Sequence, residues 1–205
     1  MRDLDWFKTL FTFIQRWALN GSVRGSYGDI RLGDMTFTAQ HSADFVAQTT
    51  QALQLIERVD PRHFYYVRSE LRCIVNEPLL YGGMYRKKTH SCSIDFLRYR
   101  CDPNLPTYEW YLATYASTLV HEATHGRIHR FGIPYNNKTW MRVERLCRLE
   151  QKRFASRLHS ETYDFRMLVP DFDPAEWQAI RKLSLIQRAR KLIVRSREID
   201  RADQN

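Results

Sequence analysis

Hydrophobic residues recur every three to four positions near the start of the chain. Between residues 3 and 19 they form one broad stripe, which predicts an amphipathic helix over residues 1–20. We expect this helix either to pack on the folded domain or on another subunit, or to lie on a membrane surface. A second helix is expected from Ala43 to Val59, where Ser42 can cap the first turn and Asp60-Pro61 can end the last.

The second half of the chain predicts three more helices. One begins at Tyr108 with Thr107 as its cap, and another covers residues from Thr139 to Leu158. The third lies within residues 171–205 and begins at Asp173-Pro174, a favourable pair for a cap and a first turn. Its polar face is rich in Arg and Lys.

The strand patterns are shorter than the helical ones. Apolar and polar residues alternate from Ser91 to Phe96, which predicts a half-buried strand. Aromatic and β-branched residues are common from Phe64 to Val75 and favour a strand there, with a helix as the alternative. Gly82-Gly83 predicts a turn or a bulge, and the Gly- and Ser-rich residues 20–33 predict a linker or an irregular loop. Helices with a few short strands predict an α+β fold.

Composition places these elements in one domain. The chain has 205 residues, of which 43% are hydrophobic, enough for a core of its own. Its four cysteines include no C-x-x-C pair and follow no signal peptide, so we expect reduced thiols in a cytoplasmic protein, with peripheral attachment to a membrane as an alternative. The cysteines are Cys73, Cys92, Cys101 and Cys147.

The net charge of +9 bears on the partners of the protein. Basic residues are spread along the chain and concentrate at residues 86–88 and 181–197, without the interleaved aromatic residues that stack on bases. A solvated basic surface is therefore expected, and nucleic acid is not an expected partner. An anionic membrane or an acidic partner is the alternative use of the basic helices.

Five residues in the helix that begins at Tyr108 carry the clearest chemistry. In His121-Glu122-Ala123-Thr124-His125 two imidazoles lie one turn apart on one helix face, with a carboxylate beside them. Two neutral nitrogen ligands and a base that can accept a proton from metal-activated water make up the H-E-x-x-H motif of metallopeptidases. Because the motif borders an apolar helix surface, we interpret it as a zinc site with Glu122 as the catalytic base rather than as a coincidence.

A catalytic zinc ion usually has three protein ligands. His129 is the nearest further candidate, but on a continuous helix it lies about 12 Å along the axis from His121, so it requires a break at Gly126. Glu144 is the stronger candidate, because it falls on the apolar face of the following helix, where a carboxylate is costly unless a cation compensates it. Glu150 lies on another side of that helix beside Arg153, and an exposed ion pair between the two is expected to account for its charge.

Eighteen residues separate His125 from Glu144, and the pattern H-E-x-x-H-x18-E resembles that of the gluzincin metallopeptidases, in particular their zinc aminopeptidase branch. The resemblance covers roughly residues 108–158. It implies His121, His125 and Glu144 as zinc ligands and Glu122 as general base. The Gly-x-Met-Glu-Asn motif of the aminopeptidases is absent, because Gly82-Gly83-Met84-Tyr85 lacks its glutamate, so aminopeptidase activity is not implied.

The resemblance also implies a zincin-like domain, with a small and mostly antiparallel sheet, an active-site helix and a helix that carries the glutamate. We place this domain at residues 34–170. The amphipathic helix of residues 1–20 precedes it, and the basic helix of residues 171–205 is expected to pack on the same domain.

These features predict a zinc-dependent peptidase that acts on a peptide or protein substrate. The substrate is expected to add as a strand to an exposed sheet edge within residues 81–96. Tyr135, His159 and Tyr163 follow the motif and are candidate donors to the oxyanion. The alternatives are a non-catalytic metal-binding module that acts by protein interaction, and a basic protein that binds membranes or nucleic acid.

Overall fold

The computed structural model describes residues 28–32, 35–39, 43–175, 178, 187 and 191–194. The helix predicted over residues 1–20 lies outside these residues, and so does most of the predicted basic helix. The helices and the small sheet confirm the α+β class. In chain order the elements are β1 (Gly28–Leu32), β2 (Met35–Ala39), α2 (Ala43–Val59), α3 (Pro61–Glu70), β3 (Cys73–Asn76), β4 (Gly83–Arg86), β5 (Ser91–Ile94), the short helix η1 (Phe96–Arg98), α4 (Tyr108–Arg130), α5 (Trp140–Ala155) and the short helix η2 (Phe165–Leu168).

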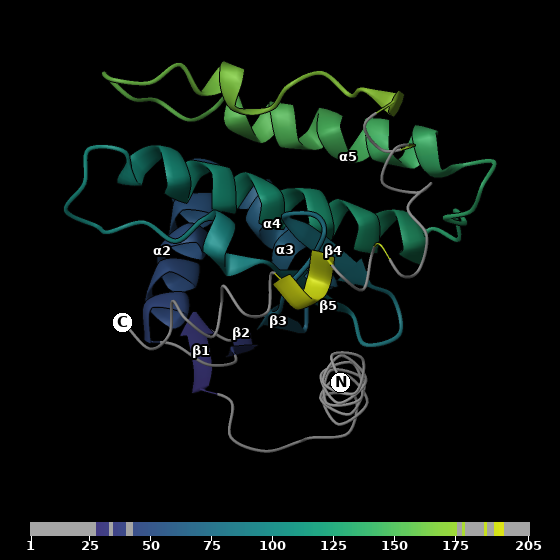
Figure 1. Cartoon of the computed structure of the whole chain (residues 1–205), viewed down its shortest axis with the longest axis horizontal. Helices are drawn as coiled ribbons and strands as arrows, with labels where there is room; N and C mark the ends of the chain where they lie inside the picture. Colours follow the sequence, from purple (N-terminus) through teal and green to yellow (C-terminus); the bar gives the residue numbers. More distant parts are fainter. Residues whose placement is uncertain are drawn as a thin grey trace, which may run out of the picture.

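Helix α4 is the central element of the fold. Helix α5 packs along one side of it, and α2, α3 and strands β4 and β5 contact it from other directions (Figure 1). Every residue from Tyr115 to Thr124 is buried, as expected for a helix that is covered on all sides. The residues from His121 to Thr124 therefore lie in the best-covered part of the molecule.

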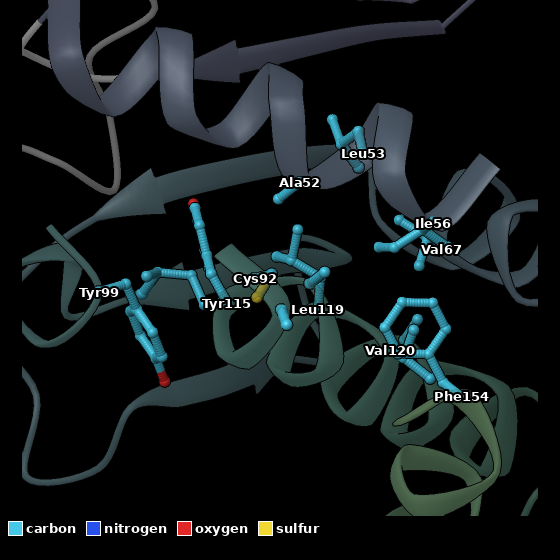
Figure 2. Packing of buried hydrophobic residues seen from close by; sticks show 14 of the residues in the cluster. Ala52, Leu53, Ile56, Val67, Cys92, Tyr99, Tyr115, Leu119, Val120 and Phe154 are labelled. Atoms are coloured by element: carbon cyan, nitrogen blue, oxygen red, sulfur yellow. The ribbon is translucent and has the colours of Figure 1, made fainter. Parts of the chain in front are cut away.

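The core lies between α2, α4 and the three-stranded sheet (Figure 2). Tyr115 is fully buried; its ring stacks on Tyr99 at a centroid distance of 5.1 Å, and its hydroxyl lies 2.7 Å from Thr49 Oγ1. Figure 2 shows Phe154 of α5 beside Val120 of α4. These contacts fix α4 against α2 and against α5.

The segment from Phe64 to Val75 contains the expected strand only at its end, where β3 begins at Cys73. Up to Glu70 it forms helix α3, the alternative to a strand. The cause lies at the start of the helix, where the Asp60 side chain accepts a hydrogen bond from the backbone N–H of His63 at 3.2 Å and Pro61 occupies the first turn. A strong helix start outweighs the strand preference of the aromatic residues.

The three-stranded sheet has the order β3-β5-β4. β5 pairs with β3 in parallel and with β4 antiparallel, so this sheet is mixed rather than mostly antiparallel. All four residues of β5 are buried, which makes the expected half-buried pattern wrong, because β5 is the central strand. β4 lies at one edge and contacts α4.

Strands β1 and β2 form a separate antiparallel pair, in which Gly28 lies opposite Ala39. β1 falls within residues 20–33, so the loop expected there is wrong for its strand residues. The bounds of α2 agree with the sequence prediction, and its expected cap, Ser42, lies outside the described residues. The Asp173 side chain accepts a hydrogen bond from the backbone N–H of Ala175 at 2.7 Å, as predicted for a helix start.

Helix α5 is also joined to α3 through a buried histidine. His63 Nδ1 lies 2.5 Å from Asp60 Oδ2, and its Nε2 lies 3.1 Å from Glu150 Oε2. Arg157 pairs with Asp60 at 2.5 Å. The expected ion pair of Glu150 with Arg153 exists, but Glu150 is mostly buried and its second oxygen binds His63, so an exposed pair does not explain it.

Replacing Asp60 by Ala is expected to destabilise the protein by about 3 kcal/mol or more, because the change leaves His63 and Arg157 without their buried carboxylate and removes the cap of α3. Urea unfolding measures this loss. Asp171→Ala is the control, because Asp171 forms an exposed pair with Lys152 and its loss should change little. Equal stability of the two variants would contradict a structural role for the Asp60 network.

Candidate metal centre

Two imidazoles converge on one side of α4. His121 and His125 are four residues apart on a helix of 3.6 residues per turn, so their side chains lie one above the other. Their Nε2 atoms are 3.2 Å apart. His121 is 7% exposed, and His125 is partly buried.

Glu144 reaches the same point from α5. Its Oε2 atom lies 3.3 Å from His121 Nε2, and its Oε1 atom lies 3.4 Å from His125 Nε2. The residue is only 1% exposed, and among the described residues Oε2 has no hydrogen-bond partner. Atoms bound tetrahedrally at about 2.0–2.1 Å from a zinc ion are about 3.3 Å from one another, so the three groups have the separations of a common ligand set.

The charge of Glu144 depends on these neighbours. Burial alone would raise its pKa, but the imidazoles of His121 and His125 beside its two oxygens outweigh that effect and hold the pKa well below its usual range. Glu144 is thus an anion that faces the two imidazoles, which is the state in which a carboxylate binds a metal ion.

Cys147 belongs to the same group. His121, His125 and Cys147 are close enough to hold a metal ion, because the sulfur and one nitrogen of each imidazole lie within 4.8 Å of one another. Cys147 is fully buried and forms a hydrogen bond with His125. The sequence pattern places Cys147 on the apolar face of α5 and gives it no role in the site. Its position three residues after Glu144 is the signal that identifies it, because such residues share a helix face.

Other polar groups hold the imidazoles and the carboxylate in place. Gln151 Oε1 lies 3.3 Å from His121 Nδ1, and the amide of Gln151 donates to Ser117 Oγ at 3.1 Å. The hydroxyl of Tyr135 donates to Glu144 Oε1 at 2.7 Å. Second partners of this kind fix the orientation of metal-binding side chains, and sequence reasoning alone does not locate them.

Glu122 lies beside the two imidazoles but faces β4. It is 4% exposed and accepts a hydrogen bond from the backbone of Tyr85. Burial raises the pKa of Glu122, although the nearby His121 and His125 partly oppose the shift. A buried carboxylate with a raised pKa beside a metal-binding group is suited to accept and return a proton.

Gly83 permits the close approach of β4 to Glu122. A Cβ atom at this position would lie 2.8 Å from Glu122 Oε1 and 2.9 Å from Thr118 Cγ2. Contacts this short do not occur between unbonded carbon and oxygen atoms in well-packed proteins, so only glycine fits there without a shift. The turn or bulge expected at Gly82-Gly83 is thus a bend followed by the first residue of β4.

The structure separates the three candidate oxyanion donors. Tyr135 is close, since its hydroxyl binds Glu144 and its ring lies 5.6 Å from that of His125. The hydroxyl of Tyr163 instead donates to the carbonyl of Pro106. Pro106 lies just before the start of α4, about 20 Å along the helix axis from His121, so Tyr163 is far from the imidazoles. His159 is exposed in the segment after α5, next to a serine that binds Glu109 near the same end of α4.

His129 is not brought into the group. Helix α4 continues without a break through Gly126 to Arg130, and His129 is exposed. Gly126 has a packing role instead, because a Cβ there would lie 2.8 Å from Glu70 Cβ and 3.0 Å from the ring of Tyr85.

Comparisons with known protein families, curated proteins and solved structures find no match for this chain. None of the described helices is long and apolar enough to cross a membrane. The four cysteines are free of disulfides. A function can therefore be inferred from the geometry of the group itself.

His121→Ala and Glu144→Ala are expected to lose stoichiometric metal binding, because each removes one of three converging donors. The measurement is the metal content after loading with Zn²⁺ and gel filtration. In the wild type, free Zn²⁺ at a hundred times its Kd should stabilise the fold by about 2.7 kcal/mol. His129→Ala is the matched control on the same helix and should bind as the wild type does. Full binding by His121→Ala would exclude this centre.

Proposed function

We propose that the chain is a zinc-dependent peptidase that hydrolyses peptide bonds with Glu122 as general base. The observation that carries the proposal is the convergence of His121, His125 and Glu144 at separations of 3.2–3.4 Å, with the carboxylate of Glu122 left outside this set and directed to β4. A site that serves structure alone has no need of such a base.

The donor set favours zinc among the common metal ions. It combines two imidazole nitrogens with one carboxylate, and Cys147 lies next to them. Magnesium and calcium prefer sites made of oxygen atoms, whereas zinc prefers nitrogen, sulfur and single carboxylates in a tetrahedral arrangement.

When bound, Zn²⁺ supplies Lewis acidity, which polarises the scissile carbonyl and lowers the pKa of a water molecule. Glu122 accepts the proton of the attacking water and passes it to the departing amine. Its buried position and raised pKa support both steps, because a base of intermediate strength can also return the proton. Tyr135 is the candidate for the oxyanion donor, since its hydroxyl already lies at Glu144 and the residue is 55% exposed.

Strand β4 is the proposed docking edge for the substrate. It forms the edge of the three-stranded sheet that contacts α4, and Gly83 and Tyr85 place its backbone against Glu122. An extended peptide that pairs with this edge would bring its own backbone to the base. This arrangement supports the expectation of a substrate strand within residues 81–96.

The resemblance to gluzincins supports the same proposal through the eighteen-residue interval between His125 and Glu144. A zincin-like fold belongs to the proposal as well, with α4 as the active-site helix and α5 as the glutamate-bearing helix. The substrate remains a peptide or protein without a defined sequence, because the aminopeptidase motif is absent.

The second candidate function is a metal-binding module without catalysis. Cys147 favours it, because a thiolate in addition to His121, His125 and Glu144 would complete four protein ligands, and structural zinc sites are closed in this way. The intact Glu122 and its place beside an edge strand favour the peptidase.

Glu122→Gln is expected to retain stoichiometric zinc and to lose hydrolysis of a broad peptide library by a factor of about 10²–10⁴, because the amide cannot accept the proton. The assay measures cleavage and metal content on the same sample. Glu161→Gln, a change at an exposed residue, is the control for the substitution itself. A wild type that binds zinc and cleaves no peptide would support the non-catalytic module instead.

Gly83→Ala should reduce hydrolysis by about 10²-fold while zinc binding stays at the wild-type level. The added methyl group would meet Glu122 and Thr118 and would displace β4 or the base by a fraction of an ångström to an ångström. No proposed ligand lies on β4, so the metal content should not change. Unaltered kcat in this variant would show that β4 and Glu122 are not part of one catalytic unit.

A further inference from the structure

The face of α5 that points away from the candidate metal centre is both apolar and positively charged. The helix buries the stripe of side chains that includes Glu144 and Cys147, and its 3.6-residue repeat turns the far stripe toward solvent. An open hollow of about 340 Å³ lies on this far stripe. We call it the α5 groove, and its lining consists of Lys138, Met141, Arg142, Arg145, Leu146 and Leu149.

Three apolar side chains of the α5 groove are exposed to water. Met141 is 39% exposed, Leu146 is 37% exposed and Leu149 is 44% exposed. Single exposed apolar residues are common on protein surfaces, but a group of them in one hollow is typical of an interaction site. Met141 and Leu149 are eight positions apart, which is about 12 Å along the helix axis. The groove therefore has the length of about two turns of a partner helix.

The charged residues of the α5 groove all have the same sign. Lys138, Arg142 and Arg145 line it, and no carboxylate does. None of the three forms an ion pair with another described residue, although Arg145 lies 6.0 Å from the ring of Phe172. Farther along the same helix, by contrast, Lys152 has a carboxylate partner. The groove thus carries positive charge that the described part of the chain does not compensate.

We propose that the α5 groove binds an acidic amphipathic helix of a partner protein. The apolar side chains of that helix enter the hollow over the three exposed apolar residues, and its flanking carboxylates lie against the three cations. The net charge of +9 attracts such a partner from a distance. This surface lies outside the proposed peptidase site, and the inference does not depend on a bound metal.

The composition of the groove favours a protein helix over other anionic partners. It contains no aromatic side chain on which bases could stack, so it lacks the feature that binds single-stranded nucleic acid. A helix that lies in a membrane surface presents a continuous apolar face, often with aromatic residues. Here Arg145 falls between Met141 and Leu149, four residues from each, so a cation interrupts the apolar face.

The test measures binding of labelled synthetic peptides to the full chain by fluorescence anisotropy. The probes are peptides of about 18 residues, long enough to form a helix in water, with leucines spaced three and four apart on one face. One series carries Glu at the flanking positions and the other carries Lys. At least one peptide of the Glu series should bind with a Kd of about 100 µM or lower, and the Lys series should not. A Glu series in which no peptide binds this tightly, or a Lys series that binds equally well, would overturn the proposal.

Two substitutions locate the binding in the groove. Arg142→Glu should weaken binding of the Glu peptide by about 10-fold and improve binding of the matched Lys peptide, and Leu149→Ser should weaken binding of the Glu peptide by about 10-fold. Arg58→Glu and Leu105→Ser are the matched controls, because both residues are exposed and lie outside the groove. All four positions are exposed, so the variants should fold, and circular dichroism checks this. Equal affinities of the groove variants and their controls would overturn the proposal.

A second measurement separates a protein partner from a membrane. Vesicles of phosphatidylcholine with about 30% phosphatidylserine present an anionic surface that attracts basic proteins. Whatever the strength of this binding, it should be the same for the wild type, Leu149→Ser and Leu105→Ser, because no apolar side chain of the groove enters the bilayer. Vesicle binding that Leu149→Ser weakens relative to Leu105→Ser would assign the groove to an anionic membrane instead and would overturn the proposal.

Discussion

A carboxylate that is almost fully removed from water determines how helices α4 and α5 can meet. Glu144 lies in the interface of α4 and α5, where an unpaired negative charge would be strongly unfavourable. The imidazoles of His121 and His125 and the hydroxyl of Tyr135 compensate it. Since these partners stand at fixed places on α4 and the following loop, α5 cannot slide or rotate without leaving the charge unpaired. The contacts that compensate the charge of Glu144 therefore also set the register of α5 against α4.

Another side of α5 is held by a second charged group. His63 of α3 lies between two carboxylates, Asp60 and Glu150, and both of its nitrogens face an oxygen acceptor. Phe154 adds apolar packing beside this network. Helix α5 is thus fixed by polar contacts both to α4 and to α3, and this arrangement supports the position of the Glu144 carboxylate at the candidate metal centre.

The parts of the site that follow from helical spacing could be predicted from the sequence. The two histidines, Glu122 and Glu144 all sit on helices whose apolar pattern is clear, and the helices bring Glu144 to the imidazoles as expected. The place of Cys147 beside the two histidines could not be recognised, because a thiol on an apolar face looks the same as a small hydrophobic residue until its neighbour across the interface is known.

Two further features depend on contacts between distant segments. The segment from Phe64 onward has the composition of a strand, and its helix depends on the side chain of Asp60, whose partners include Arg157 from far along the chain. The need for glycine at position 83 arises only when β4 meets α4, so the Gly-Gly pair reads as a turn in the sequence alone. Tyr135 and Tyr163 are similar candidates for the oxyanion donor by sequence. They differ in the structure because the chain after α4 brings Tyr135 to Glu144, whereas the chain after α5 brings Tyr163 to Pro106.

The distribution of the site over secondary structure has a consequence for its dynamics. The two imidazoles, Glu122 and the contributing side chains of α5 all stand on helices, whose backbone is already ordered by folding, so binding an ion there loses little conformational entropy. Tyr135 is the exception among the groups described, because it lies in the connection between α4 and α5 and is more than half exposed. The hydrogen bond from Tyr135 to Glu144 is therefore the contact of this centre that is most easily broken, because its donor stands on a connecting segment and not on a helix.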